Sequence, residues 1–505
     1  MSEFTIVEAI ITLIVSIPIA SGIVLYTNRD TIKRPALVST AIYIFVLAMI
    51  SSLIPKAIEN EGKGSEAWNV AWAPQVGITF GFFIDPLSLL VSLVITGLAS
   101  VAGIYAMTYY KGKHALQNAG AYHAAMLMFV GGMLGVIFST DIIEFYLFWE
   151  FMVIPTYFLV AFWGESKEKS KSIAIKYFVY MHIGALLLLF GVLWHYSLQP
   201  SGLATTNIYL MKEQFTNAKV PIEIARVIAI LVSLGFGVKM SIFPFHSWLP
   251  ETYENSPVHT TIMIGPVMVS LGIYGLVRFL YSLFEIETIK DITLLLMVLG
   301  VVTQLYGGIM AIGSKSLKTF LGYSSISQMG YVYFGIGTAV FIGVEGSIFH
   351  IVNHGIVKVL LFMVVGVVIL VTGARKFDEL GGLLDKMPLT AIAGAIGALA
   401  IAGIPPLAGF HSEWLMLAGG FGTDYQAIAI IAVIATVFSM SYALWFVKRV
   451  FFGQPMKGIE KIEEAPVELI APLFILAAAT IAIGIFPYPI YQLAQAAARG
   501  VGLEF

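Results

Sequence analysis

The chain has 505 residues, of which 58% are hydrophobic and only 11% are charged, whereas soluble domains carry about 25% charged residues. Such a composition cannot cover a water-exposed surface, so the sequence predicts an integral membrane protein with many spans. The lack of cysteine excludes disulfides, thiolate-bound zinc and iron–sulfur clusters held by this chain. The net charge of -2 argues against a nucleic-acid-binding surface.

Apolar segments follow one another along the chain, and about 20 such residues make one membrane span. We expect an all-α membrane protein with about fourteen transmembrane helices, near 5–26, 36–54, 82–107, 121–138, 141–163, 172–196, 224–252, 257–284, 289–312, 318–342, 345–373, 388–421, 425–452 and 466–494. Lysine and arginine are concentrated in the connections after odd-numbered helices, as at 29–34 and 167–171. By the positive-inside rule these connections are cytoplasmic. We therefore predict a multi-pass plasma-membrane protein with both termini on the extracytoplasmic side.

Two of the expected helices contain breaks. Helix seven carries Pro244-Phe-His-Ser-Trp-Leu-Pro250, and helix twelve carries Gly409-Phe-His-Ser-Glu-Trp-Leu415 just after Pro405 and Pro406. A proline inside a helix removes a hydrogen-bond donor, and the freed carbonyls are tolerated in a membrane only where protein or a water-filled cavity covers them. Because the two helices are five apart, they run in opposite directions. This pattern indicates an inverted repeat with one broken helix in each copy.

A lysine and a glutamate lie within the apolar helices of the first copy. Lys239 precedes the break in helix seven, and Glu150 lies about nine residues, or roughly 13 Å, into helix five. A charge at the bilayer centre costs roughly 2.5 to 3.5 kcal/mol on insertion scales. We expect the two side chains to be partners, each lowering the cost of the other's charge. A purely structural ion pair is the alternative, but ionisable residues inside a membrane are mostly functional.

Three further ionisable residues share one face of helix eleven. His350, His354 and Lys358 are spaced i, i+4 and i+8, and histidine titrates near neutral pH, so this face is typical of a proton relay. Satisfied core histidines would explain either histidine, but not the lysine in line with them. A metal site is disfavoured, because no nearby carboxylate or cysteine completes a ligand set. Glu413, after the break in helix twelve, is the predicted terminal group of the relay.

Other polar residues are candidate entrance groups. His246, Glu251 and His259 flank the cytoplasmic end of helix seven, although loop residues of this kind are often simply solvated. No nucleophile triad, phosphate-binding loop or metal cage is present, so we assign no catalytic residue and expect no catalysis by this chain alone. The lack of cysteine and the richness in isoleucine, lysine and glutamate are typical of a thermophile.

Several of these motifs together carry a family resemblance. They are Phe148-Trp-Glu-Phe-Met, Pro155-Thr-Tyr-Phe-Leu, Lys239 followed by Pro244 to Pro250, and His350, His354 and Lys358. In this order they resemble the antiporter-like subunits of the respiratory complex I superfamily, which includes complex I, the group 4 membrane-bound hydrogenases and the multisubunit sodium/proton antiporters. The resemblance covers about residues 83 to 450, and Glu413 is similar to the subunit-M type.

The resemblance implies a division of the chain and roles for its residues. Helices one to three would occupy 1–120, the first inverted repeat 121–284, the second 289–452, and helix fourteen 453–505. Glu150 and Lys239 would form the pair of the first half-channel, His350, His354 and Lys358 the central relay, and Glu413 its end. Iron–sulfur clusters and any nickel–iron centre would belong to partner subunits, with no cofactor in this chain.

One position departs from the family pattern. Members commonly place a lysine midway along helix eight, before Tyr-Gly, where this chain has Ser270. The path from Lys239 to His350 would then need water, Ser270 or another group as a bridge, or it would be interrupted. Both alternatives stay open from the sequence.

The sequence therefore predicts a proton-translocating subunit of a multisubunit membrane oxidoreductase, with sodium as the alternative coupling ion. Its expected partners are the lipid bilayer, further antiporter-like subunits and the membrane anchor of a peripheral redox arm. Two alternatives remain: a transport-inactive scaffold, which the missing helix-eight lysine favours, and a subunit of a free-standing multisubunit sodium/proton antiporter without a redox partner.

Overall fold

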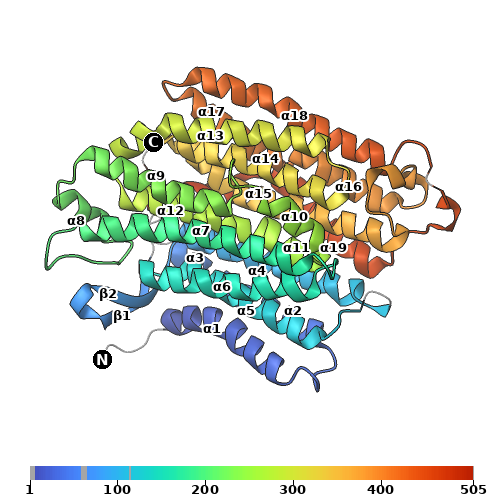
Figure 1. Cartoon of the computed structure of the whole chain (residues 1–505), viewed down its shortest axis with the longest axis horizontal. Helices are drawn as coiled ribbons and strands as arrows, with labels where there is room; N and C mark the ends of the chain where they lie inside the picture. The colour runs from blue at the N-terminus through green and yellow to red at the C-terminus, as the bar shows by residue number, and fades with distance from the viewer. Residues whose placement is uncertain (1–5, 59–64, 113–114, 456, 504–505) are drawn as a thin grey trace.

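The computed structural model describes residues 6–58, 65–112, 115–455 and 457–503, and these form a bundle of long helices that lie roughly side by side (Figure 1). Within these ranges, eleven helices are long and apolar enough to cross a membrane. This confirms the predicted class of helical membrane protein, whereas the count of fourteen spans stays a prediction. The helices are α1 (Ile6–Thr27), α2 (Pro35–Ser52), α3 (Ile54–Ile58), α4 (Pro86–Tyr109), α5 (Ala119–Phe138), α6 (Ile142–Trp163), α7 (Ser170–Ser197), α8 (Met211–Asn217), α9 (Ile222–Lys239), α10 (Trp248–Asn255), α11 (Val258–Ile262), α12 (Val269–Leu283), α13 (Ile286–Ile312), α14 (Leu317–Gly337), α15 (Phe341–Thr372), α16 (Pro388–Ile401), α17 (Ala408–Phe421), α18 (Gln426–Val450), α19 (Val467–Ile485) and α20 (Tyr488–Gly500).

A β-hairpin that we did not predict precedes α4. Strands β1 (Ser65–Ala73) and β2 (Ile78–Ile84) pair antiparallel, so the helix expected from residue 82 begins only at Pro86. The start is fixed by Asp85, whose side chain accepts a hydrogen bond from the Ser88 amide at 2.8 Å while Ser88 Oγ accepts one from the Asp85 amide at 2.9 Å. This capping box and the proline after it are strong helix-start signals.

Both predicted helix breaks are confirmed. The first separates α9 from α10 at residues 240–247, and the second separates α16 from α17 at residues 402–407. At the first break the Val238 carbonyl accepts hydrogen bonds from the indole of Trp248 and from the Ser241 amide, both at 3.1 Å, so it is not left unsatisfied. At the second, the backbone packs so closely that a Cβ on Gly409 would lie 1.9 Å from the Ala400 carbonyl oxygen. The inverted relation between the two copies stays a prediction.

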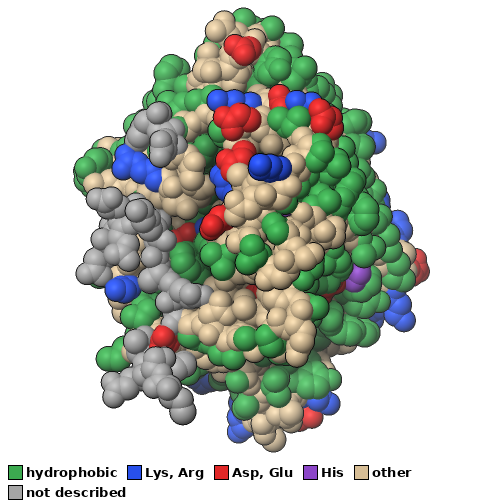
Figure 2. Space-filling view, turned by 90° about the vertical axis from the view of Figure 1, so that its left-hand side faces the viewer, with side chains coloured by type: hydrophobic (Ala, Val, Ile, Leu, Met, Phe, Trp, Pro, Cys, Tyr) green, Lys and Arg blue, Asp and Glu red, His purple; other side chains and the backbone are tan. Residues whose placement is uncertain are grey.

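The hairpin, α8 and the outer ends of α1 and α20 lie at one end of the bundle, at the left of Figure 1. Trp68 of β1 donates a hydrogen bond to Thr12 near the start of α1 at 2.9 Å, and α20 packs against α4. Figure 2 looks onto this end and shows charged side chains on the end face with hydrophobic side chains around much of the rest. The start of α1 and helix α20 therefore lie at the same end of the bundle.

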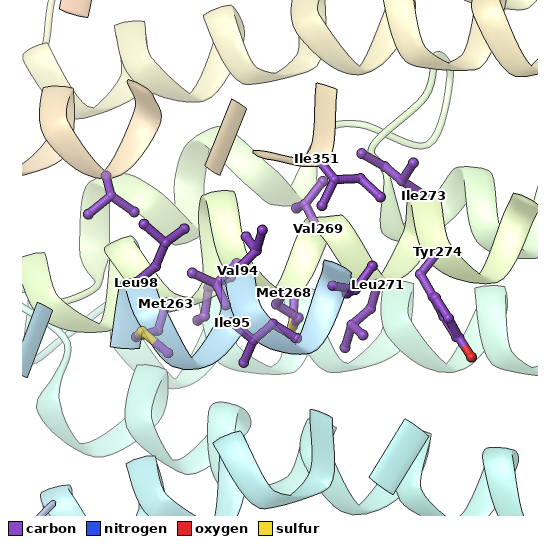
Figure 3. Packing of buried hydrophobic residues seen from close by; sticks show 14 of the residues in the cluster. Val94, Ile95, Leu98, Met263, Met268, Val269, Leu271, Ile273, Tyr274 and Ile351 are labelled. Atoms are coloured by element: carbon purple, nitrogen blue, oxygen red, sulfur yellow. The ribbon is translucent and has the colours of Figure 1, made fainter. Parts of the chain in front are cut away.

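The core lies where α4 meets the helix made of α11, a π-helical turn (Met263–Met268) and α12. Val94 and Ile95 of α4 lie beside Met268 and Leu271, with Ile351 of α15 nearby (Figure 3). These side chains are buried or nearly so. We call this contact the apolar layer.

Candidate ion pathway

Lys239 is the last residue of α9 and is only 1% exposed. Its Nζ lies 4.1 Å from the centre of the Trp149 ring and 3.9 Å from Sδ of Met152, both on α6. Among the described residues, no carboxylate lies within 4 Å of this ammonium group. A cation–π contact and a thioether therefore hold a buried cation where we expected an ion pair.

Glu150, the expected partner, instead contacts a histidine. Its Oε2 lies 3.0 Å from Nε2 of His182 on α7. Neighbouring helix residues point about 100° apart, so Trp149 faces Lys239 while Glu150 turns toward α7. Glu150 and Lys239 are therefore not in direct contact, but the two groups interact electrostatically over a longer distance.

Sequence reasoning missed His182, which we now expect to tune Glu150. Replacing His182 with alanine should lower ion uptake by the assembled complex severalfold, because the Glu150 carboxylate loses its contact with the imidazole. His182→Gln, which keeps a donor near the carboxylate, should retain most of the uptake. Uptake into sealed vesicles measures both variants, and equal uptake by His182→Ala and wild type would show that the contact is dispensable.

The second set of ionisable residues lies along α15, as its spacing predicts. The rings of His350 and His354 are 5.7 Å apart between centroids, and His350 Nδ1 lies 2.9 Å from Ser412 Oγ on α17. One helical turn further, Lys358 Nζ donates to Ser324 Oγ at 2.5 Å and to the Leu321 carbonyl at 3.0 Å on α14. All three residues are at most 2% exposed, so this lysine too is buried among neutral partners.

Glu413 lies at the far end of this set. Its Oε1 accepts a hydrogen bond from Gln328 Nε2 at 3.3 Å, and the same amide group lies 3.3 Å from the Tyr442 hydroxyl. A cavity of about 10 Å³ lies between Glu413, Gln328 and the two histidines, which is close to the least volume that holds one water. His350 Nε2 and both ring nitrogens of His354 have no hydrogen-bond partner. The geometry thus suits a single water between the histidines and the carboxylate.

The remaining predicted residues do not gather at one place. His246 stacks on Phe243 and lies 4.4 Å from the Tyr306 ring, whereas Glu251 is exposed and pairs with Lys176 at 2.9 Å. His259 is buried with its ring 6.0 Å from that of His123.

Ser270 is buried in α12 and its hydroxyl donates to the Pro266 carbonyl at 2.7 Å. The hydroxyl is therefore engaged within its own helix. Its chain neighbours Val269 and Leu271 belong to the apolar layer (Figure 3).

Sequence reasoning also missed three polar partners in the second half. Ser324, Gln328 and Ser412 contact the predicted residues through their side chains. Polar residues inside the apolar segments 318–342 and 388–421 were the available signal, but serine in a helix commonly bonds its own backbone. Only the packing of α14 and α17 against α15 distinguishes these two serines and the glutamine from polar residues that bond within their own helix.

A bundle of membrane-length helices with breaks beside buried lysine, histidine and glutamate side chains defines the class of helical ion-transport proteins. Residues 139–439 match the family described as NADH:quinone oxidoreductase/Mrp antiporter, TM, and residues 72–117 match the family described as NADH-ubiquinone oxidoreductase (complex I), chain 5 N-terminus. The chain belongs to this NADH:quinone oxidoreductase/Mrp antiporter family, which confirms the resemblance drawn from the motifs.

Individual relatives come from several kinds of membrane complex. The F(420)H(2) dehydrogenase subunit M of Methanosarcina mazei is 31% identical over 434 residues, covering 84% of either chain. The NADH-quinone oxidoreductase subunit M of Pseudomonas aeruginosa is 28% identical over 457 residues, covering 88% of this chain and 86% of its own. The fold is similar to a chain of the Mrp complex from Dietzia sp. DQ12-45-1b, with a TM-score of 0.87, 23% identity and 98% of both chains covered.

Proposed function

We propose that the chain is a proton-translocating, antiporter-like subunit of a multisubunit membrane oxidoreductase, with sodium as the alternative coupling ion. The observation that carries the proposal is the row of buried groups from Lys358 through His354 and His350 to Glu413. A structural ion pair would place opposite charges in contact, whereas these groups contact hydroxyl, amide and carbonyl partners. These polar partners lower the free-energy cost of placing a proton on a buried group. They do not hold the proton in a strong ion pair.

The driving step that we propose is electrostatic. A redox event in a partner subunit would change the charge beside Glu150 and His182, and that change would reach Lys239 through space. Loss of the proton from Lys239 would leave a neutral amine against the Trp149 ring, where the burial penalty for charge is relieved. The change in charge at Lys239 would then act electrostatically on the second set of residues. Iron–sulfur clusters would be held by the partner subunits. In a complex of the hydrogenase type, a nickel–iron centre would be held there as well.

The orientation is part of the same proposal. The connections between α6 and α7 and between α15 and α16 carry several lysines and an arginine, which supports a cytoplasmic location for that end under the positive-inside rule. The end with the hairpin and α8 is then extracytoplasmic. Two relatives are named as subunits of larger enzymes, which supports partnership with other membrane subunits, including a membrane anchor of a redox arm.

Glu413→Gln tests the function at the end of the row. Because glutamine keeps the shape but cannot carry a proton, we expect ion uptake by the purified complex in sealed vesicles to fall at least tenfold in a proton gradient assay. Trp414→Gln, at the exposed neighbouring position, is the control and should keep wild-type uptake. If Glu413→Gln transports normally, the row does not conduct.

A second candidate function is a transport-inactive scaffold, and the engaged hydroxyl of Ser270 is the observation that favours it. Under that reading neither Lys239 nor Glu413 would affect ion uptake. A free-standing sodium/proton antiporter assembly differs in its partners: the complex purified through this chain would then contain no iron or flavin.

A further inference from the structure

Ser270 lies in the apolar layer between α4 and α12. Its hydroxyl is bound to the Pro266 carbonyl, and Met268, Val269 and Leu271 lie beside α4 (Figure 3). Ser270 therefore offers no free hydroxyl that could pass a proton from Lys239 to Lys358. Lys358 would then need another source of protons.

A cavity of about 680 Å³ opens at the end of the bundle that we propose to be cytoplasmic. It lies between the start of α7, α10 and the start of α14, and its lining includes Glu165, Glu254, Thr319, Tyr323 and Arg375. Exposed residues such as Lys169 and Glu251 form its rim. The cavity is large enough for many waters and polar enough to hold them.

Lys318 lies behind the wall of this cavity. It is 3% exposed, and its Nζ donates to Glu165 Oε1 at 2.5 Å and to the Ser256 carbonyl at 2.7 Å. The other oxygen of Glu165 pairs with Arg375. The carboxylate of Glu165 therefore contacts both the buried lysine and the cavity. It lies at a point where segments of both halves meet.

Helix α14 connects Lys318 with Lys358. Ser324 follows Lys318 by six residues, or about 9 Å along the helix axis, and it accepts the hydrogen bond from Lys358 Nζ. The Leu321 carbonyl between them binds Lys358 as well. Lys318 at the start of α14 lies beside the cavity, and Lys358 of α15, next to the His354–Glu413 row, binds α14 at Leu321 and Ser324.

We propose that Lys318 and Glu165 form a separate entrance that supplies Lys358 with protons from the cavity, in place of the bridge that Ser270 does not provide. This inference rests on the proposed function. In each transfer the Lys318 ammonium would release a proton through water and the Ser324 hydroxyl to the neutral amine of Lys358. A hydronium ion of the cavity would then restore the Lys318 ammonium and leave water. The entrance bypasses the apolar layer altogether.

Lys318→Arg tests the entrance without removing the ion pair. Arginine keeps the positive charge beside Glu165 but does not release a proton in proteins, so we expect assembly and electron transfer capacity to persist while ion uptake by the complex in sealed vesicles falls at least tenfold. Adding Ser270→Lys should restore uptake, because it supplies the bridge that the family pattern contains. Lys169→Arg, at the rim of the same cavity, is the matched control and should match wild type.

The outcomes separate the entrance from the function itself. If Lys318→Arg takes up ions like wild type while Glu413→Gln does not, the entrance is refuted and the function stands. If neither variant changes uptake, both fail. Should Lys318→Arg not assemble, Thr319→Cys replaces it, because this chain has no other cysteine. A membrane-impermeant thiol reagent added from the cytoplasmic side should then block uptake, and labelling of Thr319→Cys without block would overturn the entrance.

Discussion

Replacing Lys239 with alanine is expected to lower ion uptake by the complex at least tenfold while the complex still assembles. Lys239 is the only lysine or arginine that the structure places against Trp149 and Met152 in the interior of the first half. Its removal leaves Glu150 and His182 without the group through which their charge would act on the pathway. Because no carboxylate of the described residues contacts Lys239, its loss leaves no buried anion unpaired among them, and the penalty to folding should be small.

The matched control is Lys176→Ala. Lys176 lies on the neighbouring helix α7, but its side chain is 32% exposed and pairs with the exposed Glu251. We expect wild-type uptake from it, since an exposed pair of this kind contributes little. Initial rates of uptake into sealed vesicles, normalised to assembled complex, measure both variants. Equal rates for Lys239→Ala and Lys176→Ala would remove Lys239 from the pathway.

Replacing Arg278 with glutamine is expected to destabilise the protein by about 3–5 kcal/mol, the usual result of leaving one member of a buried ion pair alone. Arg278 of α12 contacts Asp85 through two nitrogens, at 2.6 and 2.8 Å, and both side chains are at most 3% exposed. Asp85 is also the cap of α4. The pair therefore holds the start of α4 against α12, the two helices that form the apolar layer.

Unfolding by denaturant in detergent measures the change. Arg226→Gln is the control, because Arg226 also pairs with an aspartate, Asp291 at 2.6 Å, but both of these side chains are more than a third exposed. Its loss should lower the free energy of unfolding by less than about 1 kcal/mol. The double variant Asp85→Asn/Arg278→Gln should recover part of the stability, since it leaves no uncompensated charge. A loss for Arg278→Gln no greater than that of Arg226→Gln would contradict this account.

Much of the fold follows from local patterns in the sequence. The positions of most long helices follow from the length of apolar runs, and the breaks at 240–247 and 402–407 follow from proline and glycine. The hairpin escaped detection because Phe80, Phe82 and Phe83 look like the start of the next apolar helix. Their burial depends on pairing with β1 and on contact with α6, which no local pattern reveals.

The site divides in the same way. The face formed by His350, His354 and Lys358 follows from helical spacing, and the isolated lysine at 239 follows from its apolar surroundings. The partners of these groups depend on tertiary contacts: Glu150 with His182 is decided by the rotation of α6, and Lys318 with Glu165 by segments 153 residues apart. For that reason sequence reasoning found the buried charges but missed the direct contact between Glu150 and His182.

The most direct test of the central claim is ion uptake into sealed vesicles by the complex purified through this subunit, in proton and in sodium buffers. Wild type is compared with Lys239→Ala and Glu413→Gln, which lie in different halves of the chain. The account predicts that both variants lose at least nine-tenths of the uptake, whether electron transfer persists or slows with it. Wild-type uptake by both variants would contradict it and leave the chain as a scaffold.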